Sequence, residues 1–172
     1  MEKKLQLDIF DFAIGLEKEG MNFYTKASEK IPSEDLKKVF VDLAKAEATH
    51  IQAFMDLKAK AEKKGTLQLF SIPDVKEYLE ALIQDGLFPT GQEAARRLEK
   101  VDSVVSACVV AMQAEKNAIL LYSELGQLSK DPQQKKAFDN LAKEEKLHIV
   151  TVKNLRADHD PGYAALAFGR FF

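Results

Sequence analysis

Residues 43–50 read LAKAEATH and residues 141–148 read LAKEEKLH, so the pattern Leu-Ala-Lys-x-Glu-x-x-His occurs twice in the chain. In an α-helix, side chains three positions apart lie on one face of the helix. The Glu and the His of each copy can therefore bind one ion together. Both segments continue stripes of apolar residues at helical spacing, which predicts helices whose metal-binding groups face the core of a bundle.

The repetition extends beyond these two segments at a constant offset. A second set of residues stands 98 positions after the first, as Glu115 stands after Glu17, and no gap is needed. The pairs are Glu17 and Glu115, Tyr24 and Tyr122, Glu47 and Glu145, and His50 and His148. Chance similarity between amphipathic helices explains shared lysines but explains this series poorly. A register kept over two helices and their connection predicts two related helical hairpins.

Turn signals mark the expected helix ends. The residue before a proline avoids the α conformation, so the first helix should end at Ile31, before Pro32. Ser33 is a favourable N-cap for the second helix, and Gly65 is its expected C-cap. In the second hairpin, Asp131 and the proline after it supply an N-cap and a proline at the first helical position.

These signals predict an all-α chain that forms an antiparallel four-helix bundle from two repeated hairpins, joined by one long crossover. The 172 residues suit a single domain with one core. The predicted segments are a first hairpin over about residues 7–64, a crossover over about 65–102 with a short helix at 73–84, a second hairpin over about 103–157 and a tail over 158–172.

Composition and charge exclude several classes of protein. Hydrophobic residues make up 46% and charged residues 30% of the chain, which is typical of a folded domain. The net charge of −2 gives no basic surface for nucleic acid. A run of about 18 apolar residues, which a membrane span requires, is missing. The single cysteine, Cys108, allows neither an internal disulfide nor a cysteine-based metal site, and a cytoplasmic location is expected.

The candidate metal ligands offer four carboxylates and two imidazoles. They are Glu17, Glu47, His50, Glu115, Glu145 and His148. Two divalent cations would balance the four negative charges, whereas unpaired carboxylates in a bundle core are costly. Oxygen-rich ligation with one His per metal favours iron or manganese over structural zinc. We expect two iron ions about 3.5–4 Å apart, with manganese and zinc as alternatives.

The roles of the glutamates follow from their spacing. Glu17 and Glu115 lack a neighbouring histidine and are expected to bridge the two metals. Each Glu-x-x-His pair is then expected to complete the coordination of one metal. Glu144 is an alternative ligand to Glu145, since it lies four residues before His148, but the repeat register favours Glu145.

Two tyrosines accompany the ligands. Tyr24 and Tyr122 each lie seven residues after a candidate ligand glutamate. Both suit plain core aromatics, but a buried phenol needs a hydrogen-bond partner, and a ligating carboxylate is the natural one. We therefore expect both tyrosines to donate hydrogen bonds to carboxylates that bind the metals.

The motifs together resemble a known family. Residues 16–24 (LEKEGMNFY), the two Glu-x-x-His segments, and Glu115 with Tyr122 are similar to the rubrerythrin branch of the ferritin-like superfamily. The resemblance implies a ferritin-like bundle, a di-iron site held by the six candidate ligands, and hydrogen bonds from the two tyrosines. Members of that family reduce peroxide, oxidise ferrous iron, or do both.

The chain departs from full-length rubrerythrin in two respects. These 172 residues contain no four-cysteine rubredoxin module to feed electrons to the site. Rubrerythrin also places an additional glutamate one turn beyond the ligand that corresponds to Glu115, and Ala118 occupies that position here. Both departures disfavour peroxidase turnover of the rubrerythrin type.

The leading hypothesis is iron-dependent redox chemistry with peroxide or dioxygen, of the ferroxidase or peroxidase type, which serves under oxidative stress and draws on an external electron donor for turnover. The alternatives are a non-catalytic iron or metal storage protein, a dismutase like manganese catalase, and a bundle with a structural zinc pair. Three phenylalanines near the C-terminus, Phe168, Phe171 and Phe172, predict a homodimer, because a monomer gains little from exposing them.

Overall fold

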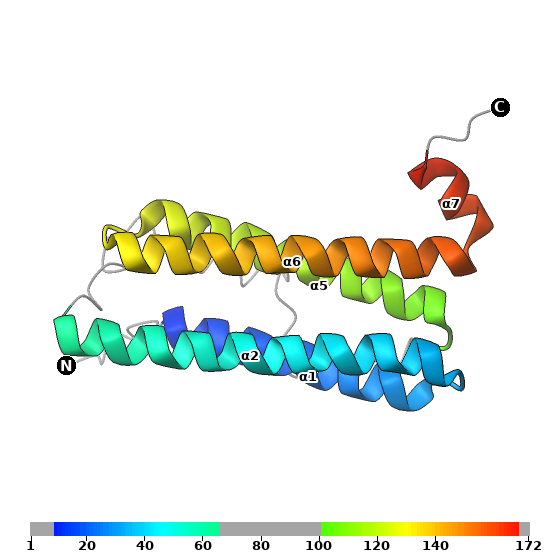
Figure 1. The fold of residues 1–172 in the computed structure, drawn as a ribbon, viewed down its shortest axis with the longest axis horizontal. Coiled ribbons are helices and arrows are strands. Elements are labelled where there is room, and N and C mark those ends of the chain that lie inside the picture. Colours follow the sequence, from blue (N-terminus) through cyan, green and yellow to red (C-terminus); the bar gives the residue numbers. More distant parts are fainter. Residues whose placement is uncertain (1–8, 66–100, 169–172) are drawn as a thin grey trace, which may run out of the picture.

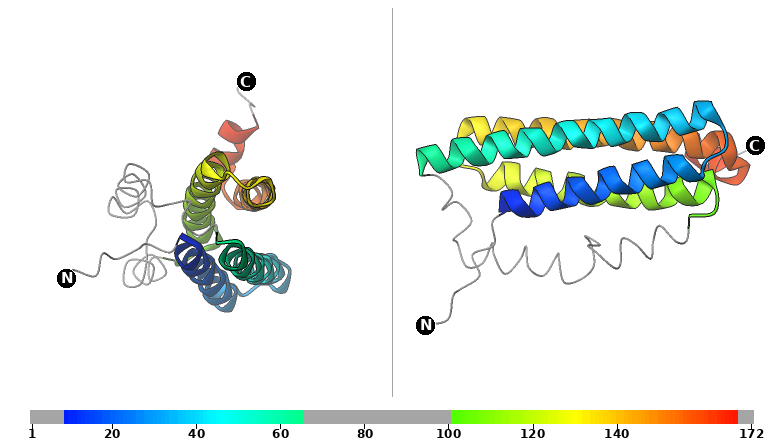
Figure 2. Two further views of the ribbon diagram at one scale, coloured as in Figure 1. Left: turned by 90° about the vertical axis from the view of Figure 1, so that its left-hand side faces the viewer. Right: turned by 90° about the horizontal axis from the view of Figure 1, so that it is seen from below.

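The computed structural model describes residues 9–65 and 101–168. Within these residues the chain forms five helices: α1 (Ile9–Lys30), α2 (Glu34–Lys64), α5 (Val104–Leu128), α6 (Pro132–His159) and α7 (Pro161–Ala167). The first four form two hairpins, α1 with α2 and α5 with α6, that lie side by side (Figure 1). Each long helix runs antiparallel to its neighbours, as the end-on and lower views also show (Figure 2). The predicted all-α four-helix bundle is confirmed, while the short helix expected at 73–84 lies outside the described residues.

The predicted helix ends are largely those observed. Gly65 ends α2 in the left-handed conformation, with φ of 66°, and its N–H donates to carbonyls of the last turn. Asp131 caps α6 by accepting from the backbone N–H groups of Gln133 and Gln134. Ser33 has the extended backbone of an N-cap, but its hydroxyl makes no capping hydrogen bond.

Apolar side chains fill the bundle in two clusters that the repeat relates to each other. One cluster includes Phe10, Phe54, Tyr122 and Phe138, and the other includes Cys108, Val152, Tyr24 and Phe40. The offset of 98 positions converts each member of the first set into a member of the second. On all four long helices the candidate ligands lie between the two clusters in sequence. The fold therefore has pseudo-twofold symmetry, with a polar layer between two apolar ones.

The tail, for which the sequence predicted no helix, contains α7. Pro161 occupies the start of α7, and Asp160 caps it by accepting from the N–H of Tyr163. The Tyr163 hydroxyl reaches the sulfur of Met112 on α5, at 3.7 Å. Helix α7 turns away from the bundle (Figure 1), and it contacts the second hairpin, with the Arg156 guanidinium on α6 over the Tyr163 ring.

Helix α5 is the most apolar of the bundle. By length and composition alone it is able to cross a membrane. The core helix of a globular protein passes the same test, and α5 packs along α6 and buries the carboxylate of Glu115.

Candidate metal centre

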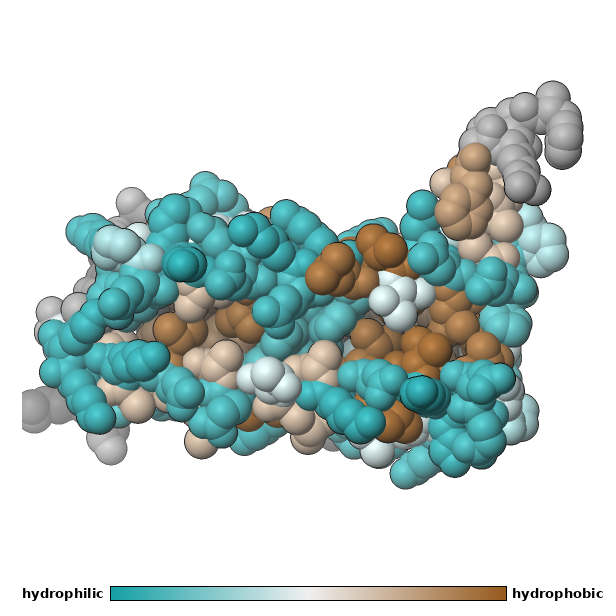
Figure 3. Space-filling view, in the orientation of Figure 1, coloured by the Kyte–Doolittle hydropathy of each residue, from teal (hydrophilic) through white to brown (hydrophobic). Residues whose placement is uncertain are grey.

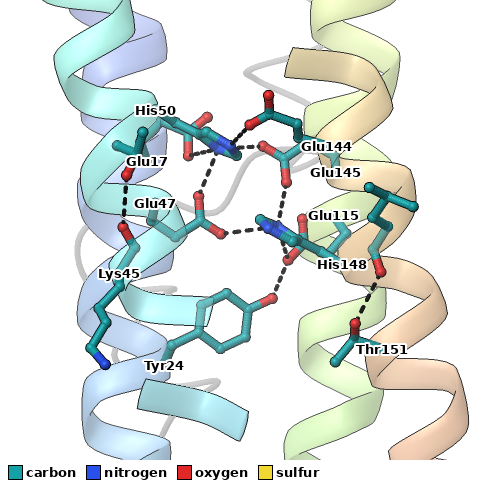
Figure 4. A network of polar contacts seen from close by, with 12 residues as sticks. Glu17, Tyr24, Lys45, Glu47, His50, Glu115, Glu144, Glu145, His148 and Thr151 are labelled. Atoms are coloured by element: carbon teal, nitrogen blue, oxygen red, sulfur yellow. Dashed lines mark hydrogen bonds and ion pairs between the residues drawn. The ribbon is translucent and has the colours of Figure 1, made fainter. Parts of the chain in front are cut away.

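The polar layer collects the six predicted ligands from four different helices. α1 and α5 each supply one glutamate, and α2 and α6 each supply one Glu-x-x-His pair (Figure 4). All four glutamates and His50 are buried, and the side chain of His148 is 12% exposed. The two imidazole rings stack with centroids 5.4 Å apart. Sequence spacing placed each pair on one helix face, and the bundle brings the faces together.

The ligand atoms form two groups of four residues, within each of which the atoms lie within 4.8 Å of one another. The first group is Glu17, Glu47, His50 and Glu145, and the second is Glu47, Glu115, Glu145 and His148. Glu47 and Glu145 belong to both groups. The carboxylates common to both groups are thus Glu47 and Glu145, whereas the sequence led us to expect Glu17 and Glu115 in that place.

Distances explain the sharing. Glu145 places one carboxylate oxygen 3.0 Å from Nδ1 of His50 and the other 2.8 Å from Nδ1 of His148. Glu47 reaches the same two nitrogens at 3.4 and 3.7 Å. Glu17 approaches only His50, at 3.5 Å, and Glu115 approaches only His148, at 3.5 Å. Glu47 and Glu145 therefore span the site, and the other two glutamates each serve one end of it.

Buried atoms in this layer lack hydrogen-bond partners. They are Nδ1 of His50, Nδ1 of His148 and both carboxylate oxygens of Glu145. The contacts between these atoms are short, but their orientation is not that of hydrogen bonds. Buried polar atoms are nearly always satisfied, and an unsatisfied one costs about 1–3 kcal/mol. Cations held between the two imidazoles and the shared carboxylates would satisfy all four atoms, so the donor set fits two metal ions.

Two tyrosines connect the hairpins through Glu17 and Glu115, which we call the outer glutamates. The Tyr24 hydroxyl on α1 donates to Glu115 on α5, and the Tyr122 hydroxyl on α5 donates to Glu17 on α1. Each phenol thus supports the glutamate of the opposite hairpin, not the one seven residues before it. Burial, followed by the charge of the bonded glutamate, raises the pKa of both tyrosines well above 10, so both phenols stay protonated donors.

Two carboxyl groups of the layer favour the protonated form in the absence of cations. Burial raises the pKa of Glu47 well above its ordinary value, and the neighbouring Glu17 carboxyl raises it further. Burial also raises the pKa of Glu115 to about 8, against the opposing influence of His148. Protons on these groups relieve the repulsion among four crowded carboxylates.

Glu145 and the two histidines favour their charged forms instead. Burial alone would raise the pKa of Glu145, but contact with His148 and His50 lowers it to about 2. Burial alone would lower the pKa of each histidine. The carboxylates of Glu115 and Glu145 overcome burial and raise the pKa of His148 to about 9, and those around His50, first Glu145, raise its pKa also. Without metal, the layer therefore neutralises itself with protons that cations would have to displace.

Glu144 has a different place from that considered for it as an alternative ligand. Its side chain is 54% exposed, and it belongs to neither group of candidate ligand atoms. Its carboxylate lies 2.9 Å from Nε2 of His50, the ring nitrogen that points away from the cluster. The adjacent Glu144 and Glu145 side chains thus contact opposite nitrogens of one imidazole. The Glu-Glu doublet was visible in the sequence, but its division of roles needed the position of α2.

The positions one turn beyond the outer glutamates hold small residues. Gly20 follows Glu17 and Ala118 follows Glu115, 98 positions apart. A Cβ added to Gly20 would lie 3.5 Å from the carboxyl carbon of Glu47. Ala118 is buried in the apolar cluster on its side of the site. Neither position supplies a fifth carboxylate, which would be the seventh ligand of the site.

Comparison with known proteins agrees with this geometry. The sequence profile of one protein family, described as Rubrerythrin, matches residues 8–156. No significant match was found among curated proteins or among solved structures. The matched residues include both hairpins, all six candidate ligands and the two tyrosines. The chain therefore belongs to the rubrerythrin family of ferritin-like di-iron proteins, without a rubredoxin module in these 172 residues.

Proposed function

We propose that this protein binds two iron ions in the polar layer and oxidises ferrous iron with peroxide or dioxygen. The observation that carries the proposal is the set of four buried, unpartnered atoms on His50, His148 and Glu145, which face one another across the bundle. The four surrounding carboxylates match the charge of two divalent cations. Membership in a di-iron family supports iron as the metal.

The protein's own groups would hold and insulate the metals. Nδ1 of each histidine would bind the metal at one end of the site, where Glu17 or Glu115 would complete the set of ligands. Glu47 and Glu145 reach both ends and keep the two positions together. The apolar clusters above and below the layer exclude bulk water, which strengthens the attraction between the cations and the carboxylates.

When bound, two ferrous ions supply two electrons, which together with two protons reduce one peroxide to two waters. The buried phenols donate hydrogen bonds to the outer glutamates and fix the direction of their free oxygens. Protons that occupy Glu47 and Glu115 in the metal-free protein leave when cations bind. These carboxyls, together with the two histidines, are therefore the groups through which protons and metal ions are exchanged.

Ala118 favours ferrous oxidation over repeated peroxidase turnover. A methyl group cannot ligate a metal, and Gly20 leaves the same position empty of ligands in the other hairpin. The neighbours of Ala118 give no substitute, because Lys116 is a cation and Asn117 pairs with Gln113. We therefore expect fast oxidation of bound iron and slow cycling with an external electron donor. In Ala118→Glu, a fifth carboxylate, as a seventh ligand, should move the site toward steady turnover.

The test is anaerobic loading of the metal-free protein with two equivalents of ferrous iron, followed by stopped-flow mixing with peroxide. We expect oxidation of two irons per peroxide at a rate well above that of free ferrous iron. Glu145→Ala should abolish the acceleration, and Glu62→Ala, an exposed glutamate near the end of α2, should not. Oxidation no faster than in the absence of protein would overturn the proposal. Iron uptake far beyond two equivalents would indicate storage, and oxygen release by manganese-loaded protein would indicate a dismutase.

The remaining parts of the proposal concern the protein as a whole. We propose a single ferritin-like domain over residues 1–172, a cytoplasmic location, and a homodimer. Support for the dimer comes from Phe168, which is 54% exposed beyond α7. Light scattering at micromolar concentration, with and without residues 165–172, tests the dimer and the part of the tail in it.

A further inference from the structure

The pseudo-twofold symmetry of the site is broken on the outer side of the histidines. Nδ1 of both rings points into the cluster, so Nε2 of both rings points out of it. At His50, Nε2 lies 2.9 Å from a carboxylate oxygen of Glu144, which comes from α6 in the opposite hairpin (Figure 4). The repeat predicts a matching partner for His148 on α2.

The matching partner is missing. The residue that stands 98 positions before Glu144 is Ala46, and a methyl group accepts no hydrogen bond. Among the residues that the structure describes, the carboxylates near His148 all face its Nδ1, and none forms a hydrogen bond or ion pair with its Nε2. The side chain of His148 is also 12% exposed, against 1% for His50. One end of the site is thus closed and supported, while the other is more open.

We propose that Glu144 is a positioning residue that makes the two metal positions unequal, so that the His50 position binds a divalent cation first and the His148 position exchanges it. This inference rests on the proposed two-metal site. It adds an order of binding that neither the six ligands nor the family supplies.

The physical reason lies in the hydrogen bond behind the ligand. A carboxylate that accepts Nε2–H fixes the ring orientation and the tautomer, and leaves the lone pair of Nδ1 for the metal. It also makes the imidazole a stronger donor to a cation. When a cation displaces the proton from Nδ1, the Glu144 carboxylate keeps His50 in the Nε2–H tautomer and holds the orientation of its ring, whereas no side chain among the described residues does this for His148.

The asymmetry suits a protein for which iron is a substrate. A tightly bound ion at the His50 position would keep the shared carboxylates Glu47 and Glu145 in place. The second ion would then enter and leave at the His148 end. Since both shared carboxylates reach both ends, binding at the first position prepares the second.

The test uses Zn²⁺, which undergoes no redox chemistry, and the full-length metal-free chain. Calorimetric titration of the unmodified protein should show two binding steps of unequal affinity. Glu144→Ala should weaken the tighter step by about tenfold or more, the usual effect of removing such a partner, and should leave the weaker step in place. Glu144→Gln, whose amide oxygen still accepts Nε2–H, should recover part of the loss. Glu62→Ala removes an equal charge from an exposed position on α2 and should change neither step.

Two further measurements identify the ends of the site. In ¹⁵N spectra of the histidine rings at one equivalent of Zn²⁺, the Nδ1 signal of His50 should move to its metal-bound position before that of His148. Ala46→Glu should strengthen the weaker step and bring the two affinities together. Two equal steps that Glu144→Ala leaves unchanged, or prior occupation of His148, would overturn the inference while leaving a two-metal site intact. Failure to bind two ions at all would instead overturn the proposed function.

Discussion

At the scale of single residues, the hydrogen bonds of Tyr24 and Tyr122 are the contacts most open to test. Both phenols are buried, and each donates to a carboxylate of the opposite hairpin. Replacing either by Phe should lower the free energy of unfolding of the metal-free protein by about 1–3 kcal/mol, the cost of leaving a buried hydrogen-bonding group without its partner. The two variants should behave alike, because the repeat places them in equivalent positions.

The matched control for these variants is Tyr163→Phe. Its hydroxyl is half-buried on α7 and donates to the weakly accepting sulfur of Met112. Urea unfolding should show a small change for this variant. Equal losses at all three positions would mean that the carboxylate partners add nothing.

The pH dependence of the metal-free protein follows from Glu115 and His148. The pKa of Glu115 rises from 4.5 to about 8, and that of His148 rises from 6.5 to about 9. In both intervals the folded state binds more protons than the unfolded state, so these groups stabilise the fold at low pH and lose that effect as the pH rises. Glu145, with a pKa of about 2, acts oppositely but only below about pH 4.5.

The thermal midpoint of the metal-free protein should therefore fall between about pH 5 and about pH 9. Glu115→Gln, which removes one of the two titrating groups, should flatten the fall. With metal present the trend should weaken or reverse, since cations displace the same protons. Differential scanning calorimetry with and without chelator measures both trends, and a midpoint that climbs with pH in chelator would contradict the assignment.

At the scale of helices, the ends and the buried sides of the helices could be predicted from local features of the sequence. Gly65 and Asp131 act through their own backbone conformation or nearest N–H groups, so their capping roles can be seen in the sequence. The apolar stripe through Leu43 shows which side of α2 faces the core. The 98-residue offset then shows that the equivalent side of α6 faces the core as well, and this needs no three-dimensional information.

What the sequence could not supply was the relation between helices. Spacing placed Glu47 beside His50 on one helix face, but whether its carboxylate reaches one metal position or both depends on how α2 and α6 are turned toward each other. The same holds for Tyr24, which bonds across to Glu115, and for Glu144, which supports a histidine on another helix. Each of these roles is a distance between hairpins.

The two apolar clusters give a prediction at this scale. Leu43 and Leu141 are equivalent in the repeat, and each is buried in a different cluster. Either Leu→Ala change should lower the free energy of unfolding by about 2–5 kcal/mol through the cavity it leaves. The loss should be of similar size at both positions and the same with or without metal. Chemical denaturation of the two variants checks this, and a loss that depends on metal would place the leucine in the site.

At the scale of the whole molecule, the polar layer connects the two hairpins, which also share both apolar clusters. Close helix contacts are concentrated between α1 and α2 and between α5 and α6, whereas contacts from one hairpin to the other are fewer. Each group of candidate ligands draws on both hairpins. Bound cations would therefore act as cross-links, and would also remove the repulsion that protons relieve in their absence.

Metal binding should consequently raise the thermal stability of the whole bundle. Binding to the folded state alone adds about 2.7 kcal/mol when free metal is at 100 times its dissociation constant. Glu47→Ala removes a carboxylate that both metal positions share, so it should abolish most of this gain while the metal-free variant remains folded. Leu43→Ala, one turn earlier on the same helix, should lower stability but keep the full gain. The measurement is the melting temperature of each protein with Zn²⁺ and with chelator. If chelator leaves the melting curve of the metal-loaded parent protein unchanged, the metal does not join the hairpins, and the apolar clusters and the hydrogen bonds of the two tyrosines hold them together without it.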